Sequence, residues 1–204
     1  GIMITASHNP HYDNGIKLYS NDGFKLLEQA EKIIEQNILQ SLKKKDSQFL
    51  GKIGIHKKSN LLYKKYALGI KNIFKRVNIA DKILIDCSNG AFSHVAKIAL
   101  KDYPNVVFIN VSPNGHNINL KCGALESGRL LKIIRENKFD YGIAFDGDGD
   151  RAIFVNRVYG IIEAEKLIVL FSKLLNQGNK NVVSTEICNK GLEENLNNIG
   201  HKLF

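Results

Sequence analysis

From residue 60 onward, short apolar runs alternate with longer segments whose apolar residues recur at helical spacing. This alternation limits the possible folds most, because strands that alternate with helices form βαβ units whose strands pair in parallel. We expect strands at residues 82–86, 106–109, 141–145, 152–155, 161–162, 181–184 and 201–204, and helices at 60–74, 91–100, 130–137, 163–175 and 188–199. The pattern predicts an α/β fold of repeated βα domains with mixed, mostly parallel sheets.

The first sixty residues follow another pattern. An apolar run at residues 1–5 predicts a strand, and the polar loop that follows it, residues 6–14, is called the serine loop below. Asn21-Asp22-Gly23 predicts a hairpin turn between residues 16–19 and 24–26. A helix is expected over residues 27–39, and the polar, basic stretch 41–59 is the best domain boundary.

Composition excludes several classes of protein. Hydrophobic residues make up 44% and charged residues 24%, which is typical of a globular chain. No run of 18 apolar residues occurs, so we expect no membrane-spanning helix. The net charge is +9, but only five of the 29 cationic residues are arginine and the lysines are scattered, which favours a solvated surface over a nucleic-acid site. Three distant cysteines argue against disulfides and zinc, and indicate a reducing cytoplasm.

Three carboxylates crowd the loop that follows the expected strand 141–145. Asp146, Asp148 and Asp150 alternate with glycines in what we call the acidic loop, residues 146–150. Like charges ~4 Å apart repel by about 1 kcal/mol even in water, so a bound cation would stabilise them. Hard oxygen ligands suit Mg²⁺ or Ca²⁺. The alternative is an exposed Asp-Gly turn, whereas an EF-hand is disfavoured because Arg157 stands where its twelfth-position glutamate belongs.

The serine loop carries a second chemical signal. Ser7 lies in a strand-to-loop bend, within Thr5-Ala6-Ser7-His8-Asn9-Pro10, where a hydroxyl can act as a nucleophile or phosphate carrier. The alternative is an Asn-Pro turn in which Ser7 only makes a local hydrogen bond. Ser7 and His8 do not by themselves make a dyad, because successive side chains of extended backbone point apart.

Together, the serine and acidic loops resemble those of the α-D-phosphohexomutase superfamily. The resemblance implies that Ser7 is phosphorylated and is itself a ligand of Mg²⁺. It implies that the other metal ligands are the aspartates of the acidic loop, Asp146, Asp148 and Asp150. By the same resemblance, Lys17 lies beside the transferred phosphoryl group, and His8 and Arg151 lie near that group or the reacting oxygens.

A third stretch of sequence indicates which members of this superfamily the chain resembles most. Residues 113–119, Pro-Asn-Gly-His-Asn-Ile-Asn, followed by Cys122-Gly123, are similar to a segment of the bacterial members that act on glucosamine phosphates, as are residues 86–91. The implied reaction interconverts glucosamine 6-phosphate and glucosamine 1-phosphate through a bisphosphate, toward UDP-N-acetylglucosamine. The alternatives are a mannose or glucose phosphate as substrate, or an inactive metal-binding fragment. Glu126 stands where the family usually has histidine.

The resemblance also implies a domain organisation. Residues 1–50 would be the C-terminal part of the first family domain, residues 51–157 the second domain, and residues 158–204 the N-terminal part of the third, so the fold would be incomplete at both ends. We expect a cytoplasmic protein whose partner is a small sugar phosphate. Neither nucleic acid nor membrane is expected as a partner, and a homo-oligomer is possible.

Overall fold

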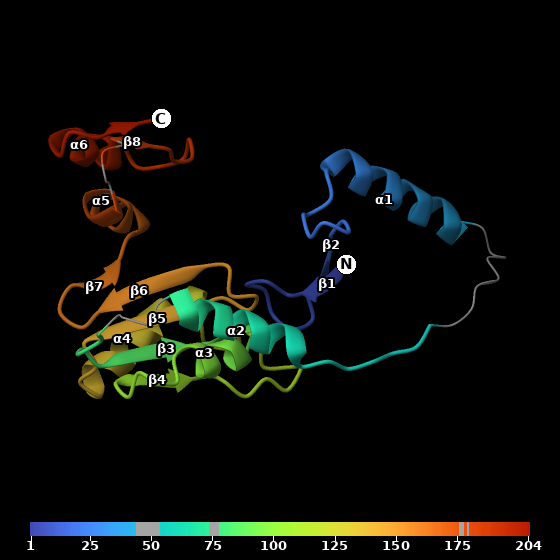
Figure 1. Ribbon diagram of the computed structural model, residues 1–204, viewed down its shortest axis with the longest axis horizontal. Coiled ribbons are helices and arrows are strands. Elements are labelled where there is room, and N and C mark those ends of the chain that lie inside the picture. The colour runs from blue at the N-terminus through green and yellow to red at the C-terminus, as the bar shows by residue number, and fades with distance from the viewer. Residues whose placement is uncertain (44–53, 74–77, 176–177, 179) are drawn as a thin grey trace.

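The computed structural model describes residues 1–43, 54–73, 78–175, 178 and 180–204. Residues 44–53, which include much of the expected boundary stretch 41–59, lie outside this range. Figure 1 shows a central sheet with helices packed on it, an N-terminal hairpin followed by a helix, and a small C-terminal unit. Within the described residues, no helix is both long and apolar enough to cross a membrane.

The central sheet has five strands in the order β4-β3-β5-β6-β7. The first three in this order run parallel to one another, and β6 and β7 are antiparallel additions at one edge. The sheet is therefore mixed, as the sequence predicts. Its strands are β3 (Ile83–Asp86), β4 (Val106–Ile109), β5 (Tyr141–Phe145), β6 (Ala152–Asn156) and β7 (Gly160–Ile162).

Helices cover both faces of this sheet. Consecutive side chains of a strand point to opposite faces, so Leu84 packs in the cluster with residues of α4 (Ser127–Glu136), whereas Ile85 packs in the cluster with α3 (Phe92–Ala99). The helix α2 (Leu61–Ile73) lies against α3 as a further layer. The main core of the described residues lies in this unit.

The N-terminal segment is much less buried. Strands β1 (Ile2–Thr5) and β2 (Gly15–Leu18) form an antiparallel pair, and the expected hairpin turn is closed by a bridge between Tyr19 and Lys25. Ile2, Ile4 and Ile16 are about 70% exposed, at 74%, 73% and 69%. The helix α1 (Glu28–Lys43) contains no buried residue within the described structure. Apolar side chains of this segment therefore face solvent.

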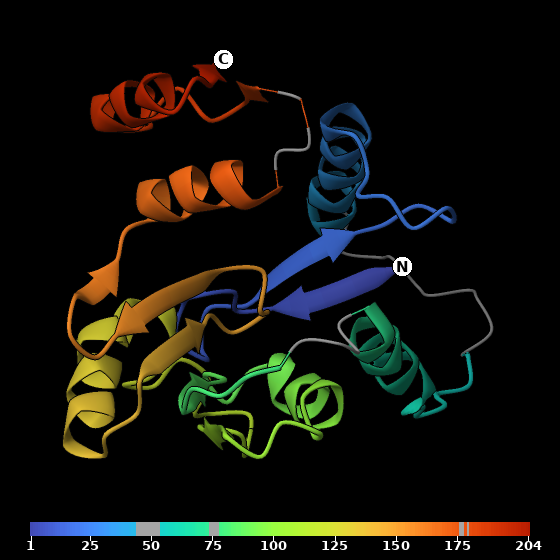
Figure 2. The ribbon, with the colours of Figure 1, turned by 60° about the vertical axis from the view of Figure 1, so that its left-hand side comes forward.

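The C-terminal unit is a small βα pair. Strands β8 (Asn181–Val182) and β9 (Lys202–Leu203) are parallel, and Leu192 and Leu196 of α6 (Lys190–Asn198) are buried. The Asn189 side chain caps α6 by accepting a hydrogen bond from the Gly191 backbone at 2.8 Å. The helix α5 (Ala164–Leu175) connects the unit to the central sheet. Both α1 and this unit project away from the central sheet in Figures 1 and 2.

The predicted elements are largely confirmed, with shifts at their ends. The main difference is at α4, which begins at Ser127 after the short 3₁₀ turn Ala124–Glu126, whereas the sequence predicts a helix that begins at residue 130. Glycine disfavours a helix interior but is tolerated in the first turn, where backbone N–H groups have no partner in the helix. The expected strand 181–184 is shorter, ending at Val182.

We expect amide hydrogen exchange to be slower in residues 82–145 than in residues 1–26. The first range contains the buried core strands, whereas β1 and β2 contain no buried residue in the described structure. Exchange followed by mass spectrometry, with the two ranges compared in one sample, measures this directly. Stronger protection in residues 1–26 would show that the N-terminal hairpin is packed in a way the structure lacks.

Candidate active site

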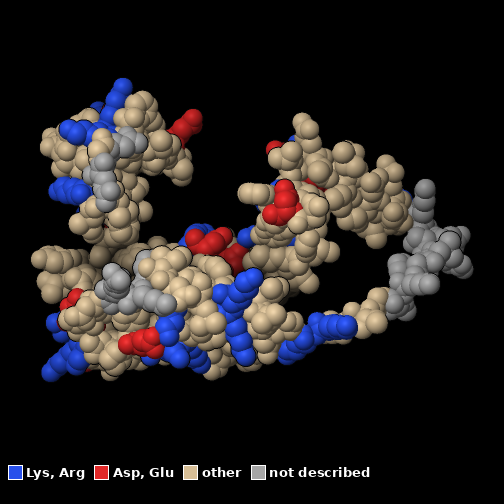
Figure 3. Space-filling view, viewed as in Figure 1, with Lys and Arg blue, Asp and Glu red and all other residues tan. Residues whose placement is uncertain are grey.

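The serine loop and the acidic loop meet at one end of the central sheet. The acidic loop follows β5, whose C-terminal end points to the same edge as those of β3 and β4. Loops at this edge of a parallel sheet commonly bind ligands. In Figure 3 acidic groups lie in the notch between the N-terminal segment and the central sheet, and further acidic and basic groups are scattered over other parts of this face.

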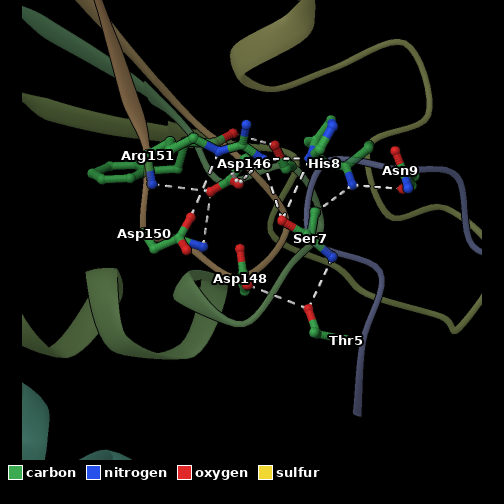
Figure 4. Close-up of polar contacts among 12 residues, drawn as sticks. Thr5, Ser7, His8, Asn9, Asp146, Asp148, Asp150 and Arg151 are labelled. Carbon is green, nitrogen blue, oxygen red and sulfur yellow. Dashed lines mark hydrogen bonds and ion pairs between the residues drawn. The ribbon is translucent and has the colours of Figure 1, made fainter. Parts of the chain in front are cut away.

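Ser7 projects its hydroxyl group toward the acidic loop (Figure 4). Its backbone is left-handed, with φ of +51°, and the Thr5 hydroxyl oxygen accepts a hydrogen bond from the Ser7 N–H at 2.9 Å. Arg151 Nη2 donates to Ser7 Oγ at 3.2 Å and also contacts His8 Nδ1 closely. Because a guanidinium group only donates, His8 Nδ1 is an acceptor in this arrangement.

The serine loop docks through its backbone. The Ser7 carbonyl oxygen accepts hydrogen bonds from the Gly147 N–H at 3.0 Å and from the Asn119 side-chain amide at 2.8 Å. A side chain at position 147 would meet the Ser7 carbonyl oxygen and approach Ile118 Cδ1 to 2.8 Å. Glycine is therefore required at this position for the two loops to come this close.

The acidic loop brings its carboxylates together. Asp146, Asp148 and Asp150 each offer an oxygen atom, and these atoms lie within 4.8 Å of one another. Asp146 is buried; its Oδ1 accepts hydrogen bonds from the backbone N–H groups of Gly149 and Arg151, at 3.1 and 3.2 Å. Its Oδ2 lies 3.0 Å from both Nε and Nη2 of Arg151. The buried Asp148 Oδ1 has no hydrogen-bond partner among the described residues.

Lys17 supplies a positive charge from β2. Its Nζ lies 2.9 Å from Asp148 Oδ2, and this hydrogen bond raises the pKa of Lys17. Desolvation opposes ionisation of Asp148, but the hydrogen bond and charge of Lys17 outweigh it and lower the pKa of that carboxyl group. Desolvation and the negative charges of Asp146 and Asp148 raise the pKa of Asp150. The cluster thus carries more negative charge than its neighbours neutralise.

A buried carboxylate organises the strand end behind the acidic loop. Asp86 accepts hydrogen bonds from the backbone N–H groups of Ser88 and Gly123, both at 2.9 Å. Gly123 has φ of +82°, and a side chain there would come within 2.6 Å of the Phe145 carbonyl oxygen. The neighbouring thiols are not reactive groups, because burial raises the pKa of Cys87 and of Cys122 to about 12.

The structure brings the seven candidate catalytic and metal-binding residues to one place. Arg151 contacts Ser7, His8 and Asp146, and its Nε lies 3.7 Å from Asp150 Oδ1. The pair of Lys17 and Asp148 is joined to Ser7 through the Thr5 hydroxyl. Glu126 is exposed, at the start of α4.

Two further residues of the site, Thr5 and Asn119, have no role that the sequence alone predicts. Thr5 accepts from the Ser7 backbone and its hydroxyl lies 3.4 Å from Asp148 Oδ2, while Asn119 binds the serine loop. Both residues belong to motifs that carry the family resemblance, and in the sequence only this resemblance could have indicated that they belong to the site. Their partners are distant in sequence and appear only in the folded chain.

Solved structures define the class of fold. A phosphoglucomutase/phosphomannomutase family protein from Burkholderia thailandensis superimposes with a TM-score of 0.75 and 21% identity, covering 100% of this chain and 44% of that one. N-acetylglucosamine-phosphate mutase, a member of the α-D-phosphohexomutase superfamily, matches in its apo form with a TM-score of 0.63 and 19% identity, covering 100% and 63%. The chain therefore has the fold of the phosphohexomutase superfamily.

Sequence comparisons identify the family. Models of phosphoglucomutase/phosphomannomutase α/β/α domains I and II match residues 1–45 and 64–160. Phosphoglucosamine mutase 1 of Shewanella amazonensis is 39% identical over 98% of this chain, and phosphoglucosamine mutase of Bartonella quintana is 40% identical over 100%. The chain belongs to the phosphoglucomutase/phosphomannomutase family, whose members are isomerases, and it spans 46% of the length of these two relatives.

Proposed function

We propose that this chain is the part of a phosphoglucosamine mutase that carries the phosphoserine and the metal ion. The reaction would interconvert glucosamine 6-phosphate and glucosamine 1-phosphate through a bisphosphate, as a step toward UDP-N-acetylglucosamine. The observation that carries the proposal is the contact of Ser7 Oγ with Arg151, which also binds Asp146 of the acidic loop. The names of the relatives at about 39% identity support glucosamine as the sugar.

The acidic loop has the chemistry of a magnesium site. Its three carboxylates are hard oxygen donors, and the buried Asp148 Oδ1, which has no partner among the described residues, is suited to a cation. We propose Asp146, Asp148, Asp150 and the phosphorylated Ser7 as the ligands. When bound, Mg²⁺ would draw negative charge from the seryl phosphate and make the phosphoryl group easier to transfer.

Ser7 would carry the phosphoryl group. In the first transfer the phosphorus–oxygen bond to Ser7 Oγ breaks, and a new bond forms to a free hydroxyl oxygen of the sugar phosphate. The proton lost by that hydroxyl balances the proton that the serine oxygen takes up. The bisphosphate then turns around and returns its other phosphoryl group to Ser7, which leaves the isomeric monophosphate and restores the enzyme.

Three cationic or polar side chains would assist this transfer. Arg151 Nη2 reaches Ser7 Oγ and would hold an oxygen of the seryl phosphate. His8 contacts the same arginine and would keep it oriented toward the serine. Lys17, fixed on Asp148, would hold or protonate an oxygen on the other side of the cluster. Such catalysis consists mainly of positioning and charge neutralisation.

Localisation, partners and domain organisation are also part of the proposal. We propose a cytoplasmic enzyme with a small sugar phosphate as its partner, neither nucleic acid nor a membrane as a partner, and the domain division 1–50, 51–157 and 158–204. The exposed apolar residues of β1, β2 and α1 are consistent with burial against further polypeptide, including a second copy in a homo-oligomer.

An activity assay tests the proposed function. We would compare this chain with the longest product of its reading frame, using glucosamine 6-phosphate, a hexose bisphosphate activator and Mg²⁺. We expect turnover from a product as long as the relatives and none from the 204 residues alone, because these span 46% of such a relative and a turning bisphosphate needs an enclosing cleft. Faster conversion of glucose or mannose phosphate would favour the alternative sugars, and no turnover with any of them would favour an inactive metal-binding fragment.

A further inference from the structure

The serine loop meets the central sheet beside a cavity. A cavity of about 330 Å³ lies between β1 and the loops that follow β3 and β4, and its lining includes His11, Asn14, His94 and Ile118. Close packing across this junction is therefore incomplete. Beside this cavity, hydrogen bonds from Gly147 and Asn119 join the serine loop to the loops that follow β5 and β4.

Asn119 makes two of these polar contacts. Its side-chain Nδ2 donates to the Ser7 carbonyl oxygen and to the Asn9 carbonyl oxygen, both at 2.8 Å. A primary amide nitrogen carries two hydrogens, so one can serve each carbonyl. The two acceptors flank His8, so this side chain holds the backbone on both sides of His8, together with the Gly147 N–H that also binds the Ser7 carbonyl oxygen.

The backbone of Asn119 is tied to the base of the acidic loop. The Asn119 N–H donates to the Ser88 carbonyl oxygen at 2.9 Å, and the buried Ser88 hydroxyl donates to the carbonyl oxygen of Phe145, the residue before Asp146. Asn119 itself is left-handed, with φ of +56°, a conformation that asparagine tolerates well. Ser88 thus links the residue that holds the serine loop to the strand end that carries the aspartates.

We propose that Asn119 is a positioning residue that sets the location of Ser7 Oγ relative to the acidic loop. This inference rests on the proposed function, because it assigns Asn119 a task in phosphoryl transfer at the same site. Asn119 would touch neither the sugar nor the phosphoryl group. It would act through the backbone of the serine loop, and its loss would slow transfer while leaving sugar recognition unchanged.

The test uses Asn119→Gly in the longest product of the reading frame. Glycine tolerates the left-handed backbone and removes both side-chain hydrogen bonds. The matched control is Asn110→Gly, because Asn110 has φ of +53° and makes no hydrogen bond to the serine loop in the described part of the chain. We expect kcat per phosphorylated molecule to fall by about 10-fold or more in Asn119→Gly, with KM nearly unchanged and the phosphoserine ³¹P resonance shifted. The control should match wild type.

The possible results of this experiment distinguish the positioning role of Asn119 from the proposed function. Wild-type turnover with equal kcat in Asn119→Gly and the control would overturn the positioning role and leave the proposed function intact. Absence of both turnover and phosphoserine in wild type would overturn both. If Asn119→Gly does not fold, Asn119→Asp retains the side-chain shape and replaces the donor with an acceptor. It should show the same fall in kcat, and wild-type kcat in that variant would equally overturn the role.

Discussion

Replacing Ser7 should abolish mutase turnover. The substitution Ser7→Gly removes the phosphoryl carrier and still accommodates φ of +51°, so the backbone bend is not strained. We expect kcat to fall by at least about 1000-fold, which is typical when a covalent nucleophile is lost. Steady-state rates with glucosamine 6-phosphate, Mg²⁺ and bisphosphate activator, in the longest product of the reading frame, measure the effect.

Ser41→Ala is the matched control for this prediction. Ser41 lies exposed on α1, where its hydroxyl donates to the Asn37 carbonyl oxygen at 2.8 Å, so its loss removes a serine hydroxyl far from the acidic loop in sequence. The control should retain wild-type turnover. Near wild-type activity of Ser7→Gly would contradict the phosphoserine assignment, whatever the control does.

The second large effect is expected at Asp148. Asp148→Asn removes a charge and a hard oxygen ligand from the acidic loop, at the side chain whose Oδ1 is buried without a partner among the described residues. We expect Mg²⁺ affinity to fall by about 10-fold or more, because Mg²⁺ demands a near-ideal set of oxygen ligands. Calorimetric titration of Mg²⁺ measures the affinity, and turnover at increasing Mg²⁺ should show partial rescue.

Asp81→Asn gives the matched charge change outside the site. Asp81 is exposed just before β3, so its substitution changes net charge by the same amount while leaving the acidic loop intact. We expect Mg²⁺ affinity to be unchanged in this variant. Equal losses in both variants would mean that overall charge, and not coordination by Asp148, governs binding of the ion.

Much of the fold follows from local sequence patterns. The alternation of apolar runs and amphipathic helices predicts each strand of the central sheet within a residue or two, since burial on one or both faces leaves a periodic signature. The order of the strands and the antiparallel direction of β6 and β7 are set by contacts between distant segments. No local pattern in the sequence therefore predicts the strand order or the antiparallel direction. The predicted helix begins at residue 130, whereas α4 begins at Ser127; the low helix propensity of Gly128 is outweighed by its position in the first turn.

The site was predictable where residue types carry chemistry. The aspartates stand out because three crowded carboxylates repel one another unless a cation lies among them. The role of Ser7 was predictable only from the family resemblance, since a serine in an Asn-Pro turn can also make just a local hydrogen bond. Asn119 does not stand out, since an asparagine in a polar loop is ordinary until the carbonyls that it binds are known. The close approach that requires glycine at position 147 is likewise a property of the assembled loops.

In the proposed reaction, Ser7 carries the phosphoryl group between the two sugar phosphates. The most direct test of this role is to incubate the longest product of the reading frame with glucosamine 1,6-bisphosphate and Mg²⁺, then locate phosphate by mass spectrometry of its peptides. We expect one phosphoryl group, on Ser7, which is removed when glucosamine 6-phosphate is added. Turnover without phosphate on Ser7, or with phosphate on another residue, would contradict this role.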